Sequence, residues 1–374
     1  MKKIIFIANI KKNPASGIYK KIIGQCLALS KLGECILICK EQETLYEERF
    51  LAKKTISEIS YNDVGSISNM IRYANKLIKA GDVNILYYRF PLKPSVYQVS
   101  LFKNAKKNGA IVFYEIPTYP FFMEQVNLSK RKFLTFSKLM VDKIIFLFSK
   151  RYIDKIPIMI GSSSVKNDPK FIPIINGIDS TDIPINNIMK NNDDDSIVLI
   201  GVGMLTAYHG YERVIQSIHN YYQNGGSKRI IFHIVGNGEI LGALKTQVEQ
   251  LNVKENVVFH GILHGEKLDE IYNKAQIGIG ALELYRRNAD IDTTLKVVEY
   301  LVRGLPVITS GFVNSGVSSD FIYQVSNDNS FFDFYKINKF LNNFNSEDRL
   351  DEILAIREIY NWDVIMRGVI KSVD

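Results

Sequence analysis

Residues 293–309 read TTLKVVEYLVRGLPVIT, which predicts a short helix, a glycine stop and a buried strand. Asp292 and the two threonines after it can cap the helix, because a side-chain oxygen there accepts a hydrogen bond from a first-turn amide. Gly304 can adopt the left-handed conformation that ends a helix, and Pro306 prevents its continuation. The apolar residues that follow favour a strand buried on both faces.

One face of this helix is apolar and the other is charged. Lys296 and Glu299 lie three residues apart near its start, whereas the apolar face is formed by Leu295, Val298, Leu301 and Val302. A cation and a carboxylate beside free backbone amides suit a ligand that carries both phosphate and sugar hydroxyls. The alternative is an exposed ion pair that stabilises the helix by roughly 0.2–0.5 kcal/mol. The spacing alone does not choose between them.

The size and composition are ordinary for a globular protein. The 374 residues are enough for two domains with separate cores, and 46% hydrophobic and 23% charged residues are typical values. No apolar run reaches the ~18 residues that span a membrane, and the run after Met1–Lys3 is too short for a signal peptide. We therefore expect a cytoplasmic protein in which Cys26, Cys35 and Cys39 stay reduced.

The charge is unevenly distributed along the chain. Residues 1–180 hold 29 lysines and arginines against 14 aspartates and glutamates, a net charge of +15, whereas the remainder holds 18 against 25, or −7. A basic half joined to an acidic half indicates that one domain faces an anionic partner. Because no nucleic-acid-binding motif is present, we expect that partner to be a membrane surface or a lipid diphosphate, at the inner face of the cell membrane, and not a nucleic acid.

Continuous apolar strands alternate with helices in both halves. The expected strands are Ile4–Ala8, Cys35–Cys39, Asn84–Tyr88, Ala110–Tyr114, Lys143–Phe148 and Phe171–Ile175, then Ile197–Gly203, Ile230–Gly236, Val257–Gly261, Ile277–Leu282 and Pro306–Ser310. Such strands favour an α/β fold with parallel sheets buried on both faces, whose ligands bind beyond the carboxyl ends of the strands. A polar stretch at 181–195 is expected to link a first domain at 1–180 to a second at 196–350. Residues 351–374 are expected to form a C-terminal helix.

The LKVVEYLVRGLPV run resembles the LK-x-x-EYL-x-x-G-x-P-V segment of the retaining GT-B glycosyltransferases of family 4. The resemblance implies two Rossmann-like parallel-sheet domains facing a central cleft, with the C-terminal helix packing back on the first domain. It also implies that Glu299 binds the ribose hydroxyls of a UDP- or GDP-sugar donor and that Lys296 lies close to the diphosphate. The first-turn amides of Thr293, Thr294 and Leu295 would face the same group.

The segment Gly201–Arg213 follows the first strand of the expected second domain and resembles the family's GRL-x-x-x-KG loop, whose Arg and Lys clamp the donor diphosphate. Those positions hold Met204 and His209 here, as in an HGY-acidic-R variant typical of surface-polysaccharide enzymes. The resemblance implies that His209 donates a hydrogen bond to phosphate while Arg286 supplies charge. The alternative is a turn histidine that has no ligand.

The family also has two glutamates separated by seven residues, and the first of them falls here on Ile291, between Asp290 and Asp292. Because the family holds the donor sugar with backbone amides of this loop, the departure bears on which sugar is used, and Asp292 is expected close to it. The two aspartates also form a D-x-D, a metal signature of another glycosyltransferase fold, but they precede a helix and do not end a central strand. We expect no metal and no other cofactor.

Glycines at the strand ends are expected to bring the backbone close to the donor. Gly236 belongs to a Gly-x-Gly turn that lacks the third glycine of a dinucleotide fingerprint, so a tight turn is favoured over an NAD site. His260-Gly261-Ile262 lies where related enzymes place backbone against the base, with an ordinary strand end as the alternative. The residues expected near the nucleotide sugar on these grounds are Gly17, Gly203, Met204, Gly210, Gly236, Gly261 and Ile262.

Arg89, Glu115 and Tyr119 follow strands at the expected cleft edge, and their charges and ring suit sugar binding, so we expect them on the acceptor side. All five histidines lie in the second half. The first half therefore offers no histidine as the general base that an inverting transfer needs. Unless Glu115 serves as that base, the chain fits a retaining front-face displacement, in which the leaving phosphate takes the proton.

Residues 130–133, with the sequence KRKF, open an amphipathic stretch with Phe136 and Met140 at helical spacing. We expect the aromatic side chains to lie in the core beneath a crossover helix and the cations on its solvent face, where they can contact anionic lipid. The expected activity is transfer of a hexose to a glycan or lipid-linked saccharide in bacterial surface-polysaccharide or glycoconjugate synthesis. Two alternatives remain, a non-hydrolysing nucleotide-sugar epimerase and a non-catalytic GT-B scaffold partner.

Overall fold

The computed structural model describes residues 1–14, 16–93, 95–119, 122, 126, 129, 131–160, 168–186, 196–292, 294–313, 316–344 and 347–373. These residues form two compact units. The first unit extends to Ile160, continues to Gly177 and takes in the chain again from Trp362, while the second holds Ile178–Asn361. Much of the expected linker, residues 187–195, lies outside the described residues.

The first unit is built on an eight-stranded sheet of order β4-β3-β2-β1-β5-β6-β7-β8. The strands are β1 (Lys2–Lys11), β2 (Gly33–Glu41), β3 (Thr44–Leu51), β4 (Lys54–Val64), β5 (Val83–Arg89), β6 (Ile111–Tyr119), β7 (Ile156–Ile160) and β8 (Phe171–Ile174). The helices are α1 (Gly17–Leu29), α2 (Ile67–Lys79), α3 (Tyr97–Lys107), α5 (Lys132–Ser149) and α12 (Trp362–Lys371).

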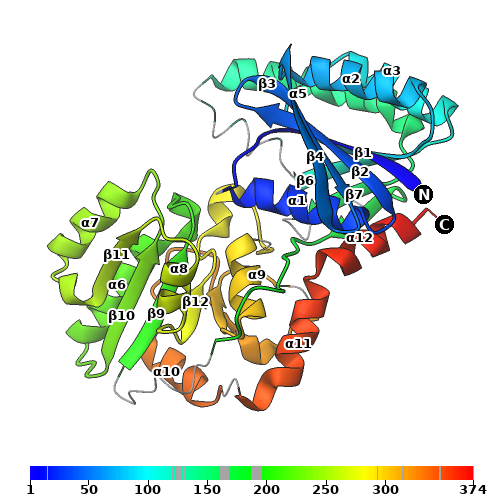
Figure 1. Ribbon diagram of the computed structural model, residues 1–374. Helices are drawn as coiled ribbons and strands as arrows, with labels where there is room; N and C mark the ends of the chain where they lie inside the picture. The colour runs from blue at the N-terminus through cyan, green and yellow to red at the C-terminus, as the bar shows by residue number, and fades with distance from the viewer. Residues whose placement is uncertain are drawn as a thin grey trace. The chain divides into compact units, whose positions relative to one another are not determined.

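Helices cover both faces of this sheet, as the continuous apolar strands predict. Figure 1 shows α2, α3 and α5 on one face and α1 and α12 on the other. Successive residues of β1 divide between the two cores, because strand side chains alternate. Ile5 and Ile7 pack with α2 and α3, whereas Ile4 and Phe6 pack with α1 and α12.

Two expectations for the first unit are wrong. The run Lys143–Phe148 is not a strand but part of α5, because the buried residues of this helix, Leu139, Asp142, Ile145 and Ser149, recur at the helical period and the helix packs on α3. The sheet is also not wholly parallel, since β3 and β4 form an antiparallel hairpin next to β2. Strand β4 is largely exposed at the sheet edge and therefore lacks the apolar run that marks a buried strand.

The second unit has a six-stranded parallel sheet of order β11-β10-β9-β12-β13-β14. Its strands are β9 (Ser196–Val202), β10 (Arg229–Val235), β11 (Val257–Gly261), β12 (Ile277–Ile279), β13 (Val307–Thr309) and β14 (Ile322–Gln324). Its helices are α6 (Tyr211–Gln223), α7 (Leu241–Gln250), α8 (Glu266–Tyr272), α9 (Leu295–Val302), α10 (Phe334–Asn342) and α11 (Leu350–Ile359). Helices α6, α7 and α10 share one core with the sheet, and α9 packs against β12, β13 and α11.

Residues 294–309 form a helix, a glycine stop and a strand, as expected. Helix α9 ends before Gly304, whose φ of +81° is the left-handed conformation that favours glycine. The division of its faces differs from the expected one, since Lys296 is buried and Leu295 is only partly buried. The charged face is therefore not a solvated face.

The C-terminal residues form two helices instead of one. Helix α11 belongs to the second unit, where Arg357 donates hydrogen bonds to Val302 O at 2.8 Å and Ile183 O at 2.6 Å. Helix α12 belongs to the first unit and packs on α1. Trp362 fills a space that only glycine leaves open, because a Cβ on Gly24 or Gly177 would lie 2.3 Å or 2.7 Å from its ring.

Candidate functional site

The order of strands in the second unit indicates where a ligand binds. The chain runs from β9 outward to β10 and β11, then returns to the other side of β9 with β12. Ligands of open parallel sheets bind beyond the carboxyl ends of the strands at such a switch point. The loops after β9 and β12 meet there: Gly210 has a φ of +66°, and a Cβ on it would lie 2.9 Å from Leu282 Cβ.

Asp292 fixes the start of α9 beside this point. Its Oδ1 accepts hydrogen bonds from Thr294 N at 3.0 Å and Thr294 Oγ1 at 2.7 Å. Its Oδ2 accepts from Ala281 N and Thr309 Oγ1, both at 2.8 Å. These four bonds engage both carboxylate oxygens of a buried side chain and hold the loop before α9. The expectation that Asp292 lies close to the donor sugar stays a prediction. Thr293 lies outside the described residues.

Lys296, on the first turn of α9, is buried against Tyr211. Its Nζ lies 3.3 Å from Tyr211 Oη and 4.9 Å from the centre of that ring. Burial lowers the pKa of Lys296 to about 7, although the nearby Asp292 carboxylate opposes the shift. An amine that water solvates poorly beside free helix-start amides is well suited to bind an anion.

His209 packs against the same tyrosine. Its ring stacks on Tyr211 with centroids 5.6 Å apart, and its Nδ1 lies 3.4 Å from Thr206 Oγ1. Burial and the charges of Lys296 and Arg287 lower the pKa of His209 to about 2, against an opposing hydrogen bond with the Met204 backbone. The imidazole is therefore neutral near neutral pH, and His209 can offer a hydrogen bond to phosphate but no positive charge.

Glu299, one turn further along α9, is held by a buried arginine. Arg303 Nη2 donates to Glu299 Oε1 at 3.3 Å and to Asp269 Oδ1 at 2.6 Å. The guanidinium also lies 4.0 Å from the centre of the Tyr272 ring. Glu299 and Lys296 thus have separate partners, which does not match the exposed ion pair between them considered from the sequence.

Glycines bring the turns after β9, β10 and β11 into contact, as the sequence suggested for a tight turn. Gly236 has a φ of +136°, and a Cβ on it would lie 1.9 Å from Gly203 O. Gly236 N donates to Gly261 O at 2.7 Å. No side chain larger than hydrogen fits at Gly236, so the three strand ends approach one another through bare backbone.

Several candidate residues near these turns are exposed. Met204, in the position of the family's clamp arginine, is 71% exposed, and Ile262 is 63% exposed. Arg286 pairs with the buried Glu283, while Arg287 lies over the Tyr208 ring at 4.5 Å. Positive charge near the switch point is therefore provided by Lys296 and Arg287. The charge of Arg286 is partly neutralised by its ion pair with Glu283.

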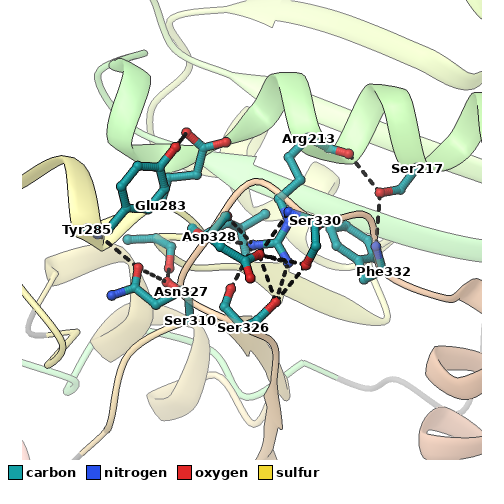
Figure 2. A network of polar contacts seen from close by, with 12 residues as sticks. Arg213, Ser217, Glu283, Tyr285, Ser310, Ser326, Asn327, Asp328, Ser330 and Phe332 are labelled. Atoms are coloured by element: carbon teal, nitrogen blue, oxygen red, sulfur yellow. Dashed lines mark hydrogen bonds and ion pairs between the residues drawn. The ribbon is translucent and has the colours of Figure 1, made fainter.

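Sequence reasoning missed the role of Arg213. Figure 2 shows this α6 side chain reaching into the loop after β14. Its Nη1 donates to Leu282 O and Ser326 O, both at 2.9 Å, and to Asp328 O at 3.1 Å, while its Nε donates to Ser330 O. The guanidinium ties that loop to the loop after β12, which leads to α9. The sequence shows an arginine after His-Gly-Tyr-Glu. It does not show that this arginine donates to four carbonyls that are distant in the chain, because no local pattern indicates such contacts.

We expect Arg213→Met to loosen these two loops. The substitution leaves partly buried carbonyls without a donor, which costs roughly 1–3 kcal/mol for each such group. Hydrogen–deuterium exchange should rise in residues 326–332, and Arg213→Lys should not restore protection, because an ammonium cannot reproduce the planar fork. The exposed Arg229→Met serves as the matched control. Unchanged exchange in Arg213→Met would contradict the assigned role.

In the first unit the strand order also reverses, between β1 and β5, and a buried charge network lies nearby. Glu115 Oε2 accepts from Gln25 Nε2 at 2.7 Å and Tyr87 Oη at 2.8 Å. Glu115 Oε1 accepts from Arg89 Nη1 and lies 3.6 Å from Lys21 Nζ. Burial raises the pKa of Glu115, but the charges of Lys21 and Arg89 and the two hydrogen bonds outweigh it and leave the pKa lowered.

This network bears on the expected acceptor residues. A buried carboxylate with three hydrogen-bond donors, an ion pair with Lys21 and a lowered pKa is a weak general base, so these contacts argue against Glu115 as the base. Tyr119 ends β6, with its ring centre 6.1 Å from that of Phe171. Gly17 is the first residue of α1, the helix that follows the switch-point strand β1.

The described residues lack both a metal-binding cluster and a membrane-spanning helix. They contain no cluster of three or more histidine, cysteine, aspartate or glutamate side chains able to hold a metal ion. None of the helices within them has the length and apolar character required to cross a bilayer.

The fold matches GT-B glycosyltransferase structures. Anabaena HepE in complex with UDP aligns with a TM-score of 0.62 at 12% identity over 99% of both chains. The lipopolysaccharide outer core galactosyltransferase WaaB aligns with a TM-score of 0.60 at 13% identity, also over 99% of both. A glycosyltransferase from Rickettsia africae aligns with a TM-score of 0.62 at 13% identity over 100% of this chain and 98% of that one.

The family match lies within the second unit. Residues 184–322 match the family described as Glycosyl transferases group 1. An uncharacterized glycosyltransferase of Methanocaldococcus jannaschii is 29% identical over 126 residues, which make up 30% of this chain and 31% of that protein. The match thus spans about a third of the relative's length. The matched family segment contains β9, the switch-point loops and α9.

Proposed function

We propose that the chain is a retaining glycosyltransferase of the family 4 type. It moves a hexose from a UDP- or GDP-sugar to a glycan or lipid-linked saccharide, in the synthesis of a bacterial surface polysaccharide or glycoconjugate. The observation that carries this proposal is the buried Lys296 on the first turn of α9, beside the switch point, with Glu299 one turn further along. The UDP bound to HepE and the galactosyltransferase activity named for WaaB support UDP-hexoses as the first donors to test.

The chemistry follows from the charges near α9. The bond between the anomeric carbon and the diphosphate oxygen breaks, the acceptor hydroxyl oxygen bonds to that carbon, and the hydroxyl proton passes to the departing oxygen. Because departure and attack occur on one face, the anomeric configuration is retained. The diphosphate gains negative charge in the transition state, which the α9 amides and the Lys296 ammonium stabilise.

Each remaining residue has a proposed part in this scheme. Glu299 binds the ribose hydroxyls, and Arg303 fixes its orientation through the 3.3 Å hydrogen bond. His209 donates to a phosphate oxygen as a neutral imidazole. Arg89 and Tyr119 contact the acceptor, and the transfer requires no metal. The net charge of +15 over residues 1–180 supports a location at the inner face of the cell membrane, where lipid-linked acceptors reside.

A transfer assay tests this proposal. The purified protein is incubated with UDP-glucose, UDP-galactose, UDP-N-acetylglucosamine or GDP-mannose, with and without lipid-linked saccharides, and released nucleotide and products are measured by mass spectrometry and NMR. The expected result is acceptor-dependent release of UDP or GDP with retained anomeric configuration, unaffected by EDTA. A changed sugar without acceptor would indicate an epimerase, and absence of nucleotide binding would indicate a scaffold. Either outcome overturns the proposal.

The affinity for the nucleotide sugar should depend on pH through Lys296. Its pKa of about 7 means that the free protein loses this proton as the pH rises through neutrality. Binding selects the ammonium form, so the dissociation constant should increase by up to about tenfold per pH unit above pH ~7. His209, with a pKa of about 2, stays neutral throughout, and burial raises the pKa of Tyr211, so neither group titrates in this range.

Isothermal titration calorimetry with a nucleotide sugar measures this dependence, over a range from about one pH unit below the Lys296 pKa to about two units above it. A sugar diphosphate ester is the correct ligand, because its own phosphates do not titrate in this range. Buffers of different ionisation enthalpy should show proton uptake on binding. The pH dependence should disappear in Lys296→Met, and its persistence there would assign the effect to another group.

A further inference from the structure

The outward face of α5 is apolar, which is unusual for a helix that covers a sheet. Eight of its large hydrophobic side chains are exposed, from 38% at Met140 to 85% at Phe133. Ile144, Leu147 and Phe148 are each more than half exposed. Contiguous exposed apolar surface of this kind marks an interaction site on a soluble domain.

The inward face of the same helix is the more polar one. Its buried residues are Leu139, Asp142, Ile145 and Ser149. Ser149 Oγ accepts from Gln98 Nε2 of α3 at 3.1 Å, and Phe146 packs on Tyr114 at 5.1 Å between ring centres. The exposed apolar residues fall within an arc of about 160° on the opposite side, at 100° per residue. The expectation that the aromatic side chains of this stretch lie in the core is therefore wrong for Phe133 and Phe136.

Cations border the apolar arc. Lys132 and Lys143 fall along one edge and Lys138 along the other, and all three are exposed. Arg151 follows the end of the helix, as does Lys150, whose charge is paired with Asp168. The acidic residue of α5, Asp142, is buried on the inward face and does not offset these charges at the surface. An apolar stripe bordered by exposed lysines is the pattern of a helix that lies in the plane of an anionic membrane surface.

We propose that the outward face of α5 is a membrane-docking surface that inserts its apolar side chains among the acyl chains of an anionic lipid leaflet. The helix lies on the bilayer and does not cross it, because its lysines and Asp142 interrupt the apolar character. A second copy of the chain fits this surface less well, since a symmetric contact would bring two sets of lysines together. Nucleotide-sugar binding requires neither this surface nor this partner.

Vesicle sedimentation tests the docking surface. The full chain is mixed at physiological ionic strength with vesicles of phosphatidylcholine alone or of phosphatidylcholine with phosphatidylglycerol. The protein should partition to the anionic vesicles, and Leu147→Ser/Phe148→Ser should reduce the partition coefficient by roughly tenfold or more. Lys132→Gln/Lys143→Gln should reduce it similarly on anionic vesicles only. The matched control is Leu350→Ser/Leu354→Ser, which removes two side chains of the second unit that are each 50% exposed.

Two further measurements keep the result interpretable. Thermal unfolding and UDP binding should be unchanged in the α5 variants, because the substituted side chains are exposed and lie in the first unit. Phe148→Trp should be quenched by lipids brominated on their acyl chains, beyond any quenching of the buried Trp362. Failure of the wild-type protein to bind anionic vesicles would overturn the proposal. So would a dimer in analytical ultracentrifugation that the Leu147→Ser/Phe148→Ser variant abolishes.

Discussion

Replacing Lys296 with methionine should lower kcat by roughly 10²–10³-fold, the loss seen when one preorganised donor to a developing anion is removed. The reason is the position of Nζ, buried at 3.3 Å from Tyr211 Oη on the first turn of α9. Few protein groups near the switch point carry positive charge, because the clamp arginine position holds Met204 and the buried His209 is neutral. Single-turnover kinetics with the best donor would measure the loss.

The same substitution should not weaken the fold. The pKa of Lys296 lies below that of an exposed lysine, near 10.4, so between pH ~7 and pH ~10 the unfolded chain holds a proton that the folded chain has lost. Stability therefore rises with pH across this window, and methionine removes the cost of burying the amine at neutral pH. The exposed Lys339→Met is the matched control. If the Lys296→Met protein retained full turnover, the Lys296 amine would have no role in the mechanism.

Replacing Glu299 with glutamine should weaken binding of UDP or GDP by roughly 10–150-fold, the equivalent of about 1.5–3 kcal/mol for a hydrogen bond to a charged group. The change keeps the shape of the side chain and removes its charge. Arg303 retains Asp269 as an ionic partner at 2.6 Å, so the fold should survive. Fluorescence or calorimetric titration gives the dissociation constant, with the exposed Glu358→Gln on α11 as the control. Equal affinities in the two variants would remove Glu299 from the nucleotide site.

Helix α9, the end of that helix and the strand after it could be predicted from the sequence. A capping region, a glycine in the left-handed conformation and an apolar run each depend on neighbours in the chain. The burial of Lys296 could not be read in this way. It depends on Tyr211, which lies 85 positions away and meets the amine only after β9 and β12 pair.

The features that were predicted wrongly or not predicted also depend on contacts between residues far apart in the sequence. The run Lys143–Phe148 is as apolar as a buried strand, yet it belongs to a helix whose apolar side faces outward. The inference that apolar residues lie in the core therefore fails for this run. The polar edge strand β4 was not predicted, because antiparallel pairing can stabilise a strand that has no hydrophobic face. The hydrogen bonds of Asp292 could not be predicted either, because two of the four come from Ala281 and Thr309, which are distant in the sequence.

The most direct test of the central claim is calorimetric titration of UDP and GDP into the wild-type protein and the Lys296→Met and Glu299→Gln variants. The account predicts saturable binding of one of the two nucleotides at a single site, with clear weakening in both variants and none in Lys339→Met or Glu358→Gln. Binding of neither nucleotide by the folded wild-type protein, or equal affinity in all five proteins, would contradict it.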